Sequence, residues 1–170
     1  MEETFVVPEL VNCNDAILHK PIEKFNFEQP PTDSVELAHT LARAVLKYNG
    51  LGVSANQLGL PYRAFAIKAE QIIVCFNPLI VDASEEQVYL EEGCLSYPNL
   101  FVKVKRPKTI KVRYTEPNGN VVTKVFDGLT ARVYQHELDH LNGVSHIKRA
   151  HPMHVQQAKA KAKKLSRIKK

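Results

Sequence analysis

The sequence predicts an α+β fold, in which mostly antiparallel sheets pack around a central helix and another helix lies nearer the N-terminus. The predicted strands follow one another along the chain instead of alternating with helices. Several of them alternate apolar and polar residues, as strands do in an antiparallel sheet with one solvated face. The chain has 170 residues, of which 44% are hydrophobic and 24% charged, so it is long enough to bury a core.

The first predicted helix covers residues 34–48, after an irregular segment with several prolines. Asp33 stands where an N-cap residue is expected, and Glu36 follows three positions later. Apolar side chains then recur at helical spacing through an alanine-rich stretch, and Gly50 marks the stop.

A series of strands is predicted between this helix and the next. The last two strands flank Pro117-Asn118-Gly119, a sequence typical of a hairpin turn. A second helix is predicted over residues 127–142, with Gly143 as its C-terminal stop. The predicted strands cover residues 62–67, 71–76, 78–82, 86–91, 101–104, 109–114 and 120–126.

The positive net charge of +5 comes from the end of the chain. Residues 148–170 hold nine Lys or Arg and no Asp or Glu, whereas the rest carries 14 basic and 18 acidic side chains. This distribution excludes a uniformly basic nucleic-acid-binding domain. We expect a catalytic domain over residues 1–150 and a basic tail over residues 151–170. The tail is compatible either with a helix or with a disordered end.

Other features of the composition indicate the compartment. No apolar run approaches the ~20 residues that a membrane span needs, so we expect no membrane partner. The acidic start, Met1–Phe5, is unlike a signal or transit peptide. The three cysteines are odd in number and widely spaced, which does not indicate a disulfide framework. We therefore expect a cytoplasmic protein.

The second predicted helix carries the pattern His136-Glu137-x-x-His140. Residues four apart face the same side of a helix, so both imidazoles can reach one metal ion. Glu137 lies one position from a ligand, close enough to act on a water molecule at the metal. The alternative is a charged, solvated helix face, but the remainder of this helix is apolar, which favours a metal site.

Two histidines do not complete a metal site, which needs a third protein ligand. His146, His151 and His154 follow the motif without a recognisable spacing. Cys94 precedes it in a turn beside a glycine, and a thiolate is a strong ligand for zinc or ferrous iron. For a single cysteine a buried structural role is the commoner one, so the residues alone leave the third ligand open.

A glycine-rich segment, Gly50–Gln57, directly follows the first helix. Its two glycines allow the backbone to approach a ligand closely, and Gln57 adds a side-chain amide donor. Because these glycines end a helix instead of beginning one, phosphate binding is not expected.

Taken together, three segments resemble the three motifs of the peptide deformylase family. They are Gly-x-Gly-x-x-Ala-x-Gln at Gly50–Gln57, Glu-Gly-Cys-Leu-Ser at Glu92–Ser96 and Gln-His-Glu-x-x-His at Gln135–His140. The resemblance covers about residues 5–150, as in a compact, divergent member. It implies a metal-dependent hydrolase, with iron as the usual metal, that acts in protein biosynthesis. Such an enzyme removes the N-formyl group from the formylmethionine of nascent peptides and releases formate.

The resemblance also implies a role for each motif residue. One divalent metal ion, Fe²⁺ first and Zn²⁺ or Ni²⁺ as alternatives, would be bound by Cys94, His136 and His140. Glu137 would carry the proton between water and the leaving amine. The Gln57 amide and the backbone N–H of Leu95 would stabilise the oxyanion together with the metal.

The same resemblance implies an apolar pocket for the methionine side chain. Asp139 would support the metal site from behind, with Arg106 as its partner. The residues implied to contact the substrate are Leu51, Gly52, Gly93, Leu90, Leu129 and Val133, the two glycines through their backbones.

The chain departs from the common bacterial pattern at Ser54, which replaces an alanine, and at Phe101, where many members carry an arginine implicated in substrate binding. Its short basic tail suits a phage-encoded or organelle-like version as well as a bacterial one, in the bacterial or host cytoplasm. The tail is also expected to bind the ribosome near the peptide exit, through phosphate contacts.

Two other classes of protein are the alternatives to this interpretation. A small metallopeptidase would take its third ligand after His140 and would not need Cys94. A basic-tailed RNA- or ribosome-binding protein would hold a structural metal in a closed site. The presence of Glu137 and of an open fourth position argues against both.

Overall fold

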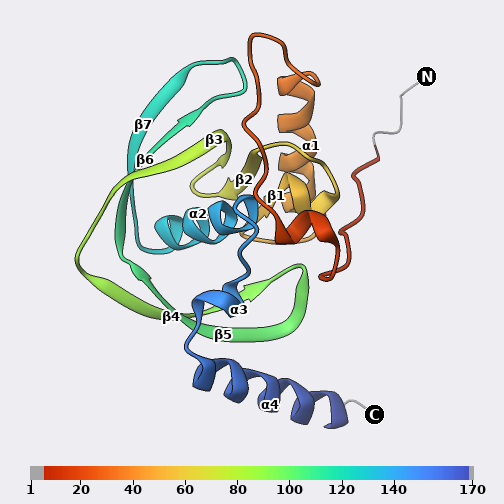
Figure 1. Cartoon of the computed structure of the whole chain (residues 1–170), viewed down its shortest axis with the longest axis vertical. Helices are drawn as coiled ribbons and strands as arrows, with labels where there is room; N and C mark the ends of the chain where they lie inside the picture. Colours follow the sequence, from red (N-terminus) through yellow and green to blue (C-terminus); the bar gives the residue numbers. More distant parts are fainter. Residues whose placement is uncertain (1–5, 169–170) are drawn as a thin grey trace.

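A computed structural model gives the fold of residues 6–168 (Figure 1). The acidic start, Met1–Phe5, and the last two lysines of the tail lie outside the described residues. The elements in chain order are η1 (Ala16–His19), α1 (Ser34–Lys47), β1 (Gly52–Ser54), η2 (Ala55–Leu58), β2 (Ala64–Lys68), β3 (Ile72–Ala83), β4 (Gln87–Cys94), β5 (Tyr97–Pro107), β6 (Thr109–Thr115), β7 (Val121–Asp127), α2 (Gly128–Leu141), α3 (His146–Arg149) and α4 (Pro152–Ile168).

The predicted α+β class is confirmed. A five-stranded antiparallel sheet has the order β1-β2-β3-β6-β7, and β4 and β5 form a separate two-stranded sheet. Helix α2 lies between the two sheets, while α1 lies beside β1 and β2 on the other side of the large sheet (Figure 1). The helix with the His-Glu-x-x-His pattern is therefore the central one.

Strand β2 shows how the sequence builds two cores. Ala64 and Ala66 pack in the cluster that contains the apolar face of α1, whereas Phe65 and Ile67 pack with α2 residues such as Tyr134. Successive side chains of a strand point to opposite faces, so a strand covered on both sides is apolar throughout. The small alanines let α1 approach closely, and the large residues fill the space beneath α2.

The predicted helices agree with the structure to within one or two residues. Asp33 caps α1, because its carboxylate accepts hydrogen bonds from Val35 N and Glu36 N, both at 2.8 Å. Gly143 has φ of 74° after α2, and a Cβ there would lie 2.7 Å from Lys20 N. The start signal at Asp33 thus has a hydrogen-bonding cause, and the stop signal at Gly143 has a steric one.

The two strands predicted over residues 71–76 and 78–82 are one strand, β3, with a register shift between Phe76 and Leu79. Asn77 lies at the shift with φ of 48°. Its side chain donates to the backbone carbonyl of Phe25 at 2.9 Å and accepts from the Phe25 N–H at 2.8 Å. This long-range pairing holds an irregular residue inside a continuous strand.

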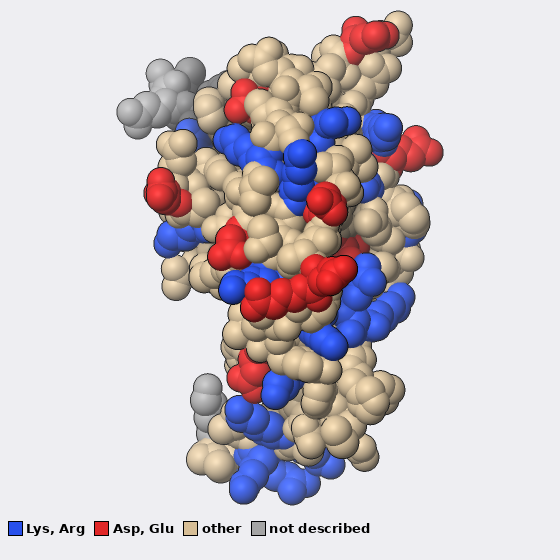
Figure 2. Space-filling view, turned by 90° about the vertical axis from the view of Figure 1, so that its left-hand side faces the viewer, with Lys and Arg blue, Asp and Glu red and all other residues tan. Residues whose placement is uncertain are grey.

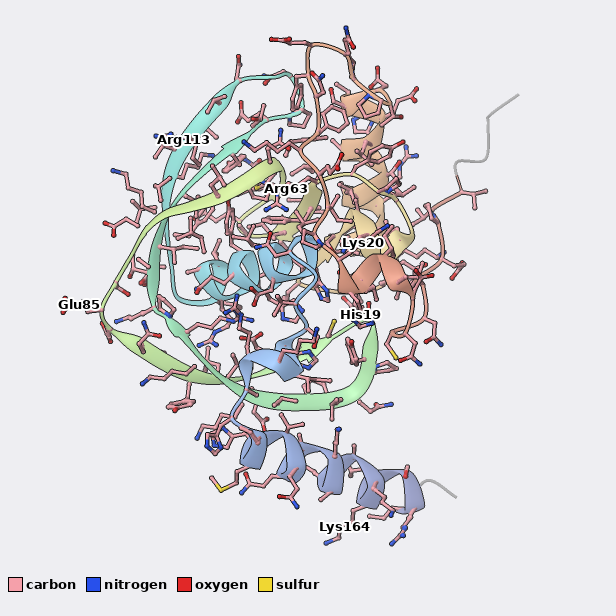
Figure 3. All side chains as sticks on the ribbon, viewed as in Figure 1. His19, Lys20, Arg63, Glu85, Arg113 and Lys164 are labelled. Carbon is pink, nitrogen blue, oxygen red and sulfur yellow. The ribbon has the colours of Figure 1, made fainter. Side chains whose placement is uncertain are left out.

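The basic tail forms a helix, α4, which packs against β5. Ala158 is buried, whereas Lys164 points away from β5 (Figure 3). Figure 2 shows Lys and Arg side chains gathered at the lower end of the molecule, where α4 lies. Of the two alternatives left by the sequence, the structure therefore shows a helix docked on the hairpin.

Candidate metal centre and active-site cavity

Three side chains from two elements converge beside α2. His136 and His140 lie one turn apart on α2, and Cys94 ends β4. The distance from His136 Nε2 to His140 Nε2 is 3.2 Å, and that from His140 Nε2 to Cys94 Sγ is also 3.2 Å. All three donor atoms lie within 4.8 Å of one another.

These distances fit a single tetrahedral metal ion. Bonds of about 2.0–2.1 Å to nitrogen and about 2.3 Å to sulfur place neighbouring ligand atoms roughly 3.3–3.6 Å apart. One thiolate and two imidazoles suit zinc or ferrous iron. Among residues 6–168, this is the one group of three or more His, Cys, Asp or Glu side chains whose ligand atoms all lie within 4.8 Å of one another. Cys94 therefore joins the two histidines, which the sequence alone left open.

The three downstream histidines do not join the group. His146 is buried, and its ring centroid lies 5.6 Å from that of His136. Its Nε2 lies 3.2 Å from the carbonyl oxygen of Leu100. Burial, together with the charge of His136, lowers the pKa of His146 to about 4. His151 and His154 contact each other near the start of α4, at a centroid separation of 5.9 Å.

A buried carboxylate orients the first histidine. Glu92 Oε1 lies 2.9 Å from His136 Nδ1, which leaves Nε2 for a metal ion. Burial opposes the charged form of His136, but hydrogen bonds to Cys94 and Glu92 outweigh it and raise the pKa to about 10. A site that stabilises positive charge between these groups is suited to a cation, which would displace that proton on binding.

Arginines hold Glu92 in turn. Arg106 donates to both of its carboxylate oxygens, at 2.6 and 2.9 Å, and Arg132 donates to Oε2 at 2.9 Å. Burial alone would raise the pKa of Glu92, but the hydrogen bonds from Arg106 and His136 hold it well below the usual range. Glu92 is therefore a fixed anion.

The network continues to Asp139, between the two histidines on α2. Arg106 Nη1 donates to Asp139 Oδ2 at 2.8 Å, which is the partner that the resemblance implied. Arg149 adds two contacts from α3, at 2.6 and 3.0 Å. Glu92 stands in the second motif, but the sequence predicted no role for it, nor for Arg132 or Arg149. Of these three residues, only Glu92 had a signal in the sequence. It precedes Cys94 by two positions, and residues two apart in a strand lie on the same face.

Glu137 lines the same cavity and is buried. Its Oε2 atom makes no hydrogen bond within the described residues, and burial raises the pKa of the carboxyl group to about 7. A Cβ on Gly52 would lie 2.7 Å from Glu137 Oε1, so only glycine leaves room for the carboxyl group. An unpaired carboxyl group of this kind can accept and return a proton.

Gln57 is held in one orientation by a capping box. Its Oε1 accepts from Ser54 N at 3.0 Å and from Ser54 Oγ at 3.1 Å. The Nε2 group consequently donates to Ser96 Oγ at 3.0 Å and points at Cys94 Sγ, 3.6 Å away. The hydroxyl group of Ser54, which the alanine of the family pattern lacks, thus supplies one of the two hydrogen bonds that hold the amide.

A cavity of about 450 Å³ opens beside these groups. Its wall includes Gln57, Leu95, Glu137, Cys94 and His136, whereas His140 is not among the lining residues. Of the residues expected to contact substrate, the following line it: Leu51, Gly52, Gly93, Leu129 and Val133.

Leu90 does not line the described cavity, contrary to expectation. It lies on β4 two residues before Glu92 and pairs with Val104, so it is one strand repeat farther from Cys94 than Glu92 is. At about 3.3 Å per residue, that repeat moves the side chain roughly 6.6 Å along the hairpin.

No helix within the described part of the chain is long and apolar enough to cross a membrane.

Comparisons with known proteins point to one family. The family model described as polypeptide deformylase matches residues 7–156. A peptide deformylase of Thermotoga petrophila is 39% identical over 135 residues, which is 78% of this chain and 79% of that protein. The crystal structure of the Synechococcus elongatus enzyme with actinonin has a TM-score of 0.83 at 29% identity, over 92% of this chain and 86% of the other. A class I type b enzyme of Acinetobacter baumannii bound to Met-Ala-Ser has a TM-score of 0.77 at 29% identity, over 85% and 98%.

Proposed function

The chain belongs to the polypeptide deformylase family, and we propose that Cys94, His136 and His140 hold the metal ion with which it works. It is a metal-dependent hydrolase that removes the N-formyl group from nascent peptides. The observation that carries the assignment of residues is the meeting of these three donors with the unpaired Glu137 carboxyl group beside one cavity.

The metal we propose is Fe²⁺, with Zn²⁺ or Ni²⁺ as substitutes. Bound by a thiolate and two imidazoles, such an ion supplies Lewis acidity, which lowers the pKa of a water molecule and draws charge from a carbonyl oxygen. The donor set supports a borderline-soft ion over calcium or magnesium, which prefer oxygen ligands.

The protein's own groups divide the remaining work. Glu137 takes the proton of the attacking water and returns it to the departing amine, so that formate and a free amino terminus result. The Gln57 amide, fixed by Ser54, and the Leu95 backbone N–H donate to the oxyanion that forms at the formyl carbon. The Ser54 hydrogen bonds hold the Gln57 amide before the reaction, so this donor needs little reorganisation when the charge develops.

The cavity walls support binding of the formylmethionine side chain. Leu51, Leu129 and Val133 offer apolar contacts, and the backbones of Gly52 and Gly93 offer hydrogen-bonding groups. The Acinetobacter baumannii enzyme binds Met-Ala-Ser, and we propose that this chain holds the corresponding part of its substrate in the same way. The catalytic domain would then be residues 1–150, working in the cytoplasm.

Metal analysis of protein purified without oxygen, paired with formate release from formyl-Met-Ala-Ser, tests this assignment. We expect one equivalent of metal, retained activity, and loss of both in the Cys94→Ala variant. Retention of the metal by Cys94→Ala, with cleavage of internal peptide bonds, would instead indicate a metallopeptidase. Metal that stays bound without any formate release would indicate a structural site.

We also propose that the basic tail binds ribosomal RNA where the substrate emerges. Exposed lysines cover α4, and no acidic residue follows residue 139. Nearby on the hairpin, Lys103 and Lys105 lie over the exposed ring of Tyr89, at 5.4 and 5.7 Å from its centroid. Clustered cations beside an aromatic ring suit phosphate and base contacts.

Charge removal on the outer face of α4 tests this docking. Replacement of Lys159, Lys163 and Lys164 by Gln keeps the helix and removes three charges, so ribosome co-sedimentation at low salt is expected to weaken markedly. Replacement of Lys68 and Lys111, which are exposed on the large sheet, provides the control. Equal sedimentation of both variants would contradict the proposal.

A further inference from the structure

A second groove lies between the β4–β5 hairpin and α4. Its volume is about 280 Å³. The hairpin contributes Glu91, Asn99 and Phe101 to its wall, and the inner face of α4 contributes Ala158, Lys161, Ala162 and Leu165. None of the α4 residues belongs to the wall of the first cavity, so the groove depends on the packing of α4.

The groove continues the active-site cavity. Glu91, Asn99 and Phe101 line both spaces. The Phe101 ring lies directly over Gly93, since a Cβ at that glycine would be 2.6 Å from Phe101 Cε1. A peptide that leaves the first cavity past Gly93 therefore meets the Phe101 ring and then α4.

The walls of the groove are mainly apolar. Phe101 is 56% exposed and Leu165 is 49% exposed, so both offer apolar surface that a ligand can cover. The two alanines leave space between them. Lys161 and Glu91 carry opposite charges, so the groove has no net charge with which to select a charged side chain.

We propose that this groove binds the substrate downstream of its formylmethionine and prefers an apolar side chain at the third or fourth residue. The proposal rests on the proposed function, because it extends the same peptide. An extended chain advances about 3.3 Å per residue, so these positions lie roughly 7–10 Å beyond the methionine. Phe101, in place of the usual arginine, and α4 together set this preference.

Peptide hydrolysis by the metal-loaded full chain tests the preference. The substrates are formyl-Met-Ala, formyl-Met-Ala-Ser-Ser, formyl-Met-Ala-Leu-Ser and formyl-Met-Ala-Ser-Leu. We expect kcat/KM to be about three- to tenfold higher for one of the leucine peptides than for the all-serine peptide, as burial of a leucine in a half-open groove predicts. Values for all three tetrapeptides within twofold would overturn the proposal.

A pair of matched variants assigns the preference to the groove. Ala162→Arg fills it, whereas Ala160→Arg adds the same side chain to the exposed part of α4, about 200° around the helix. We expect Ala162→Arg to abolish the leucine preference and Ala160→Arg to retain it. Both variants should hydrolyse formyl-Met-Ala at the wild-type rate, and equal unfolding midpoints would show that both are folded.

The possible failures are distinguishable. A leucine preference that survives Ala162→Arg would place the selecting surface elsewhere and overturn the groove's role. Loss of formyl-Met-Ala hydrolysis in Ala162→Arg alone would show that α4 belongs to the catalytic cavity itself, which also contradicts the proposal. Absence of formate release from every peptide by the wild-type chain would overturn the proposed function.

Discussion

At the scale of single residues, the side chains of the site are held in place by hydrogen bonds from neighbours for which the sequence predicted no role. Glu92 orients His136, while Ser54 orients Gln57. The motif residues themselves were predictable from their spacing, since one helical turn separates His136 from His140. Their supports were not, because contacts across 40 or more positions of the chain, such as that of Arg132 with Glu92, leave no local pattern.

Replacement of Glu137 by Gln is expected to keep the metal and to lose most of the activity. The amide has the shape of the carboxyl group but neither accepts nor releases a proton at neutral pH, and loss of general acid–base catalysis typically costs about 10²–10⁴-fold. The measurement is formate release together with metal content. Activity within a factor of a few of the wild type would show that another group carries the proton.

Replacement of Ser54 by Ala is expected to lower kcat about two- to fivefold and to leave KM unchanged. It removes one of the two hydrogen bonds that fix Gln57, and a single neutral hydrogen bond is worth about 0.5–1.5 kcal/mol. Ser34→Ala, in which the lost hydrogen bond lies at the start of α1, serves as the control. An unchanged kcat would mean that the Ser54 backbone N–H alone holds the amide.

Exposure to air should distinguish the metals that Cys94 binds. Ferrous iron and a cysteine thiolate are both oxidisable, and Cys94 is partly exposed in the cavity wall. Iron-loaded protein is expected to lose activity in air over time, whereas nickel-loaded protein keeps it. The two half-lives, measured by formate release, would be equal if iron oxidation were not the cause.

At the scale of elements, α2 is positioned by its ends as much as by its apolar face. Its C-terminal carbonyl at Leu141 accepts from Ile22 N at 2.8 Å and from Arg63 Nη1 at 3.1 Å. The helix boundaries were predictable from Asp127 and Gly143. The contact with Arg63 was not, because Arg63 precedes β2 and is far from α2 in the sequence. Asn77 is a similar case, since its pairing with Phe25 joins two predicted strands into one.

Replacement of Arg63 by Met is expected to lower the free energy of unfolding by about 1–2 kcal/mol. Its guanidinium also donates to Ile22 O at 3.1 Å and to Asn142 Oδ1 at 2.8 Å, so acceptors at the end of α2 would lose a charged donor. Urea denaturation measures the change. Arg113→Met, on the outer edge of β6 (Figure 3), should change stability by less than about 0.5 kcal/mol. Similar losses in both variants would exclude a specific role for Arg63.

At the scale of the whole molecule, α4 is set apart from the catalytic machinery. Every residue that lines the active-site cavity precedes residue 138, and α4 reaches the rest of the chain mainly through β5 (Figure 1). One side of this helix is covered by the hairpin, and Ala158 is buried on that side. That this side faces the hairpin followed from no local pattern, because helix docking depends on the shape of both surfaces.

Deletion of residues 152–170 is therefore expected to separate three properties. Hydrolysis of formyl-Met-Ala should stay within about twofold of the full chain, since no cavity residue is removed. Ribosome co-sedimentation at low salt should fall steeply, because the deletion removes seven of the nine basic side chains after residue 147 and their phosphate contacts. The preference for a downstream leucine should vanish, because one wall of the groove is lost.

Loss of formyl-Met-Ala hydrolysis by a truncated protein that remains folded would place α4 within the catalytic domain. Undiminished sedimentation would locate ribosome binding elsewhere, with the hairpin lysines around Tyr89 as the next surface to test.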